Sequence, residues 1–123
     1  MHSIAIAVGG AVGAVLRFWL STAVSTLLAG RFPYGTLAVN VMGSGLMGFL
    51  YVLFYERMEG SAELRAALLI GLLGAFTTFS TFSIETMLLL EEGEHLKAGV
   101  NTLASVTVCL IVCWAGIILG RQL

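Results

Sequence analysis

Four long apolar segments, separated by short groups of charged and turn-forming residues, constrain this chain more than any other feature. They run over residues 3–29, 35–55, 64–90 and 97–120. At ~1.5 Å per residue, a helix over any of them would cross a hydrocarbon core of roughly 30 Å. Hydrophobic residues make up 59% of the 123-residue chain and charged residues only 11%. The sequence predicts an all-α integral membrane protein with four transmembrane helices in one membrane domain, residues 1–123.

The charges, the cysteines and the lack of catalytic motifs argue against nucleic-acid binding, a disulfide and enzymatic activity. A formal net charge of −1, without any run of Lys or Arg, offers no basic face to nucleic acid. The sequence contains no Ser/His/Asp, paired-carboxylate or metal-ligand constellation, so we do not expect an enzyme. Cys109 and Cys113 are four residues apart in the last span, poorly placed for a disulfide within one helix. We interpret them as buried small residues.

The third span carries a cluster of small and polar residues at its centre. Gly74 opens the cluster, and Phe79 and Phe82 lie between its hydroxyl side chains. These hydroxyls belong to Thr77, Thr78, Ser80, Thr81 and Ser83. Irregular backbone survives at this depth only where protein or a polar cavity covers it. The cluster is compatible with a helix packing seam, but it favours a break in the third helix at a permeation or binding site.

The other spans also place polar groups at membrane depth. Arg17 in the first span pairs with another group, faces a vestibule, where it would attract anions, or snorkels to the interface as an anchor. Asn40, the only amide inside the second span, either holds helices together or contacts a polar solute. Small polar side chains at intervals of four run along one face of the last span, where they form a packing seam or the wall of a narrow pathway. This row consists of Asn101, Ser105, Cys109 and Cys113.

The charges between the spans give almost no preference for one orientation in the membrane. Arg57, Arg65 and Arg121 fall on the side of the termini, against Arg31 and Lys97 on the other side. Membrane orientation follows the bias in Lys and Arg between the two sides. A count of three against two therefore allows the chain to insert in either orientation. The sequence therefore favours a chain that inserts both ways and pairs with its inverted copy. Such a pair reproduces the inverted repeat of larger transporters.

Three stretches of the sequence resemble the Fluc (CrcB-like) family of fluoride channels, and the resemblance covers essentially the whole chain. The most specific is GAFTTFSTF over residues 74–82; the others are GGAVGA over 9–14, leading to Arg17, and GTLAVN over 35–40. The resemblance implies a dual-topology, antiparallel homodimer in a bacterial inner membrane. Two passive fluoride pores and a central structural sodium ion are implied with it.

The resemblance also implies roles for single residues. Phe79, Phe82 and Asn40 would contact fluoride, and the main-chain carbonyls of Gly74 and Thr77 would hold sodium. A polar track and a vestibule complete the implied pathway. The track residues are Ser80, Thr81 and Ser105, and the vestibule residue is Arg17. Family members often carry hydroxyl groups where this chain has Cys109 and Cys113, and thiols are weaker donors.

The residues themselves support an anion pathway, with two alternatives. An aromatic ring has a positive edge, so Phe79 and Phe82 could offer ring edges to a small anion. A small dual-topology multidrug exporter is one alternative, although it would need a carboxylate in the first span, which has none. A membrane scaffold that transports nothing is the other. Glu85, farther along the third span, must be neutral, paired or hydrated.

Overall fold

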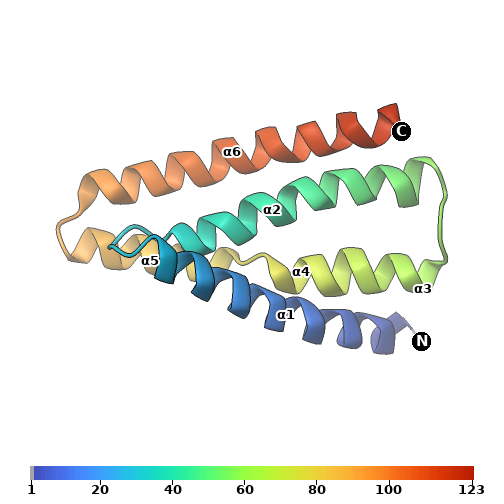
Figure 1. Ribbon diagram of the computed structural model, residues 1–123, viewed down its shortest axis with the longest axis horizontal. Coiled ribbons are helices and arrows are strands. Elements are labelled where there is room, and N and C mark those ends of the chain that lie inside the picture. Colours follow the sequence, from blue (N-terminus) through green and yellow to red (C-terminus); the bar gives the residue numbers. More distant parts are fainter. Residues whose placement is uncertain (1) are drawn as a thin grey trace.

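The computed structural model describes residues 2–123, and its regular secondary structure over that range is all helical. Four segments are long and apolar enough to cross a membrane: His2–Leu27, Tyr34–Glu56, Ala62–Glu91 and His95–Gln122. They run alternately up and down, with both ends of the chain at the same end of the molecule (Figure 1). The prediction of four membrane-spanning helices is confirmed, and the observed ends lie within a few residues of the predicted ones.

The first and last spans are single helices, whereas the middle two are composite. α1 covers His2–Leu27 and α6 covers His95–Gln122. The second span joins α2, Tyr34–Tyr51, to a short π-helix, η1, Val52–Glu56. The third span consists of α3 (Ala62–Arg65), the π-helix η2 (Ala66–Leu72), α4 (Leu73–Phe76) and α5 (Phe79–Glu91).

Two residues with extended backbone separate α4 from α5. Thr77 has φ −88° and ψ 161°, and Thr78 has φ −153° and ψ 117°. They form the thin connection between α4 and α5 in Figure 1. The Thr78 hydroxyl accepts a hydrogen bond from the Thr81 N–H at 3.1 Å and so caps α5. This connection lies close to the middle of the third span.

Glycines allow the helices to approach within backbone contact. A Cβ on Gly13 of α1 would overlap the carbonyl of Leu72 in η2, and a Cβ on Gly116 of α6 would overlap the carbonyl of Gly45 in α2. These contacts place α1 against the first half of the third span and α6 against α2 (Figure 1). Close packing of this kind substitutes for a hydrophobic driving force inside a membrane.

Ion pairs tie the connections together at both ends of the bundle. Arg31, between α1 and α2, lies 3.4 Å from Glu92 after α5. At the opposite end Arg121 contacts Glu56 at 2.8 Å. The Lys97 ammonium donates to Glu94 at 2.9 Å and holds the pKa of that carboxyl below its usual value. These paired charges thus lie where the spans end, as expected for helices that cross a membrane.

Candidate functional site

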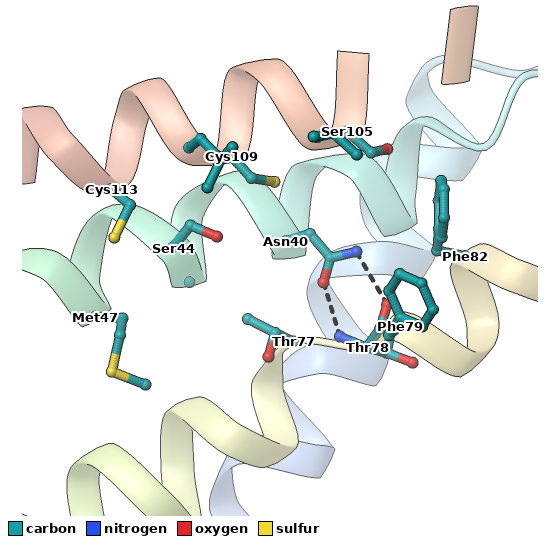
Figure 2. A pocket seen from close by; sticks show the side chains of 13 residues that line it. Asn40, Ser44, Met47, Thr77, Thr78, Phe79, Phe82, Ser105, Cys109 and Cys113 are labelled. Atoms are coloured by element: carbon teal, nitrogen blue, oxygen red, sulfur yellow. Dashed lines mark hydrogen bonds between the residues drawn. The ribbon is translucent and has the colours of Figure 1, made fainter. Parts of the chain in front are cut away.

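Asn40 of α2 bridges the extended connection between α4 and α5. Its Oδ1 accepts a hydrogen bond from the Thr78 N–H at 2.7 Å, and its Nδ2 donates to the Thr78 carbonyl at 3.0 Å (Figure 2). The amide therefore pairs both main-chain groups of a residue that no helix pairs. Of the two roles that the sequence left open for Asn40, this is the helix-joining one. One N–H of the amide has no part in the bridge, because Nδ2 carries two hydrogens.

Arg17 of α1 reaches the same region from the other side. Its Nε donates to the carbonyl of Ala75, in the last turn of α4, at 2.9 Å. That carbonyl lies among the four at a helix end that lack an intrahelical partner. Arg17 thus pairs with a main-chain carbonyl, and pairing is one of the roles that the sequence left open for it.

Three other carbonyls at the connection, those of Gly74, Phe76 and Thr77, have no hydrogen-bond partner among residues 2–123. The Thr77 N–H and hydroxyl both donate to the Leu73 carbonyl, each at 3.1 Å. The Thr78 N–H donates to Asn40 Oδ1 and is therefore not available to these carbonyls. No hydrogen bond across the connection reaches Gly74 or Thr77 in this range. These are the carbonyls that the resemblance assigns to sodium. Unpaired oxygen atoms of this kind fit a small, hard cation.

A cavity of about 430 Å³ lies between α2, α6 and the α4–α5 connection. Asn40, Phe79, Phe82 and Ser105 all line it, so the structure brings together four of the six residues assigned to the fluoride pore. Figure 2 shows the two rings at one end of this cavity. Their centroids are 5.4 Å apart, and Phe79 is 76% exposed whereas Phe82 is only 9% exposed. No carboxylate from residues 2–123 lines the cavity.

The other two pore candidates, Ser80 and Thr81, are not among the residues that line this cavity, although Thr78 beside Ser80 is. The Ser80 hydroxyl is 3.4 Å from that of Thr78. Thr81 lines a second cavity of about 330 Å³ between α1, α2 and α5, together with Thr36 and Glu85. The buried Oε1 of Glu85 has no hydrogen-bond partner within residues 2–123. The rest of that lining consists of α1 hydroxyls, from Ser21, Thr22, Ser25 and Thr26.

This α1 hydroxyl row was missed by the sequence reasoning, although the sequence carried a signal for it. Ser21 and Ser25 are four residues apart, as are Thr22 and Thr26, so each pair occupies one face of the helix. The row begins one turn after Arg17. The polar surface on α1 is therefore longer than the single arginine indicated.

The polar row on α6 divides into two parts. The Asn101 amide, 1% exposed, donates to the Thr86 hydroxyl at 2.9 Å, and the Ser105 hydroxyl donates to Asn101 Oδ1 at 3.5 Å. The first part thus holds α6 to α5. Cys109 and Cys113 continue the row along the cavity wall. Both are half-buried free thiols, so the prediction that they are buried holds only in part.

The fold and the cavities define a small multi-pass membrane protein with polar sites between its helices. Its sequence identifies the family: the chain belongs to the CrcB-like proteins, since the family model described as "CrcB-like protein, Camphor Resistance (CrcB)" matches residues 4–117. The resemblance found in the sequence is thereby confirmed.

Similar proteins carry the name fluoride-specific ion channel FluC. One from Methylococcus capsulatus is 56% identical over 119 residues, covering 97% of this chain and 52% of the relative. One from Geobacter sulfurreducens is 53% identical over 120 residues, covering 98% and 97%, and one from Magnetococcus marinus is 47% identical over 116 residues, covering 94% of each. The chain thus spans about half the length of the first relative and nearly all of the other two.

Proposed function

We propose that this protein is a passive, fluoride-selective channel of a bacterial inner membrane. The observation that carries the proposal is the cavity in which two aromatic rings and an amide converge without a carboxylate. The names of the relatives support fluoride as the solute. The extended backbone at Thr77 and Thr78 supports a break in the third span at this cavity. Irregular backbone beside a polar cavity is the pattern found at membrane transport sites.

The lining suits a compact anion better than a large one. Ring edges of Phe79 and Phe82 are weakly positive, and the free N–H of Asn40 is a true donor. Together they replace a few contacts of the hydration shell. A small, strongly accepting ion regains the most from short contacts, as in other pores where dipoles substitute for water.

A second, inverted copy of the chain completes the proposed channel. Phe79 is 76% exposed beside the cavity, so a partner is needed to enclose the ring and the ion next to it. The weak charge bias of the loops, three against two, allows both insertions. Two inverted copies would form one pore at each of the two equivalent cavities.

The unpaired carbonyls support a sodium ion where the two copies meet. Gly74 and Thr77 of each copy would offer four main-chain oxygens together, and a hard cation prefers oxygen ligands. The bound ion would neutralise carbonyl dipoles that helix breaking leaves unsatisfied. Because main chain does the binding, Thr77→Ser should keep both dimer and flux. Replacing all sodium by a bulky organic cation should weaken the dimer, and a dimer unaffected by sodium removal would contradict the site.

Fluoride efflux from liposomes tests the channel directly. Purified protein should release trapped fluoride down its gradient, measured with a fluoride electrode, while chloride stays trapped. Liposomes without protein measure the background leak of fluoride. Equal rates for the two halides, or flux that requires a proton gradient, would overturn the proposal. The second result would point to a coupled exporter instead.

A further inference from the structure

Three sulfur atoms belong to side chains of the large cavity. Cys109 and Cys113 come from α6, and Met47 comes from the facing helix α2. Figure 2 shows Met47 and Cys113 toward the end of the cavity opposite to the two rings, with Cys109 between them and Ser105 along α6. Both thiols are free and half-buried, and neither makes a side-chain hydrogen bond within residues 2–123. The thiols are thus accessible and uncommitted.

The spacing of the two cysteines favours a bridging metal ion over a disulfide. Side chains four apart on a helix have Cβ atoms about 5–6 Å apart. A disulfide needs Cβ atoms about 3.5–4.5 Å apart, so the helix would have to distort. Two sulfurs bound to one ion are separated by up to about twice a metal–sulfur bond of ~2.3 Å, which is roughly 4.6 Å. Rotation of the two side chains about χ1 can reach that separation without backbone movement.

We propose that Cys109 and Cys113 form a binding site for a soft, thiophilic divalent cation, with Met47 as a third ligand. Thiolate and thioether sulfurs select soft metals over hard ones. Binding forms three metal–sulfur bonds, two to thiolates and one to the thioether, and releases two protons, one from each thiol. A divalent ion with two thiolates and a neutral thioether has no net charge. Such a complex avoids the cost of a charge at membrane depth.

The site has a consequence for the proposed channel. The sulfurs share one cavity with Phe79, Phe82 and Asn40, so an ion held there occupies the proposed anion pathway. Soft metal ions should therefore block fluoride flux. Only this effect on flux rests on the proposed function, because metal binding itself needs no permeation.

Titration of the full-length protein in detergent micelles with Cd²⁺ tests the site. We expect one Cd²⁺ per chain, an ultraviolet sulfur-to-cadmium charge-transfer band, and tighter binding as the pH rises, because protons leave. Cys109→Ser and Cys113→Ser should each weaken binding by at least about tenfold, since losing even an outer-shell partner costs this much. Met47→Leu should weaken it less. His95→Gln is the matched control and should bind like the parent.

Two results would overturn the site: no charge-transfer band in the parent, or an unchanged band in the double Cys→Ser variant. Fluoride efflux with and without Cd²⁺, normalised to each variant's own rate without metal, then tests the pathway separately. Block in the parent that disappears in both cysteine variants supports site and pathway together. Binding without block supports the site and contradicts the placement of the pore in this cavity.

Discussion

Replacing Asn40 by Leu should loosen the connection between α4 and α5. Leu is similar in size, but the N–H and carbonyl of Thr78 lose the partners now at 2.7 Å and 3.0 Å. Side-chain hydrogen bonds between membrane helices contribute ~0.6 kcal/mol on average, up to ~1.7. Burying unpaired groups costs more, about 1–3 kcal/mol each. The hydrogen-bond range applies here, because the freed Thr78 N–H can return to the Gly74 carbonyl in a regular helix. For the two bonds together we expect the free energy of unfolding to fall by about 1–3 kcal/mol.

Asn40→Asp gives a matched variant with a pH-dependent outcome. A protonated Asp can accept from the Thr78 N–H and donate to the Thr78 carbonyl, whereas an ionised Asp places a negative charge against that carbonyl. The folded protein therefore favours the protonated form. The Asp variant should be most stable at low pH, where its carboxyl is protonated, and should lose stability as the pH rises and the carboxyl ionises. The Leu variant should show the same deficit at every pH.

Equilibrium unfolding by sodium dodecyl sulfate in micelles, followed by tryptophan fluorescence, measures these stabilities. Fluoride efflux measures the second consequence, because a re-formed helix at Thr78 would turn Phe79 away from the cavity and abolish flux. An Asn40→Leu protein as stable as the parent would refute the bridge. A destabilised Asn40→Leu protein with parental flux would show instead that the bridge does not position the ring.

Three further predictions concern the rings, the glycines and the assembly. Phe79→Ile and Phe82→Ile keep an apolar side chain but remove the ring edge, so flux should fall steeply while assembly persists; parental flux in both would exclude ring-edge contacts. A Cβ on Gly71 would lie 2.6 Å from a carbonyl oxygen of α1, where ordinary contact begins at 3.4 Å, whereas nothing lies near Gly99. Gly71→Ala should therefore destabilise the protein by about 1–3 kcal/mol and Gly99→Ala should not, as measured by detergent unfolding. A single cysteine beside Leu123, in a protein without native cysteines, should react with an impermeant reagent from both membrane faces; labelling from one face would exclude inverted pairing.

The four spans could be predicted from sequence because their lengths depend only on apolar runs bounded by charges. The π-helices could not. In η2, Ala66–Leu72, every residue is apolar or Gly, so no pattern separates a π-helix from an α-helix. The π-helix packs closely against Gly9 and Gly13 of α1, a contact between segments more than 50 residues apart that the sequence of η2 does not indicate.

The sequence predicted which residues make up the candidate site better than it predicted which of them contact one another. Asn40 and the cluster around Thr78 were both identified, but they are 38 residues apart, and neither stretch indicates that it contacts the other. Phe79 and Thr81 illustrate the same limit within one helix. The two residues are two positions apart in a helix that turns about 100° per residue. Their side chains therefore point about 200° apart and face different cavities. The resemblance implies one continuous polar track for both.

Arg17 and Asn40 explain how a span can carry extended residues at membrane depth. Each unpaired main-chain group there costs several kcal/mol, and these two side chains pair three such groups, from Ala75 and Thr78. The carbonyls of Gly74 and Thr77 have no hydrogen-bond partner among residues 2–123. Carbonyls of this kind carry an energetic penalty at membrane depth, which the proposed sodium ion or the proposed second copy would lower. The irregular backbone beside the cavity therefore supports both parts of the proposal.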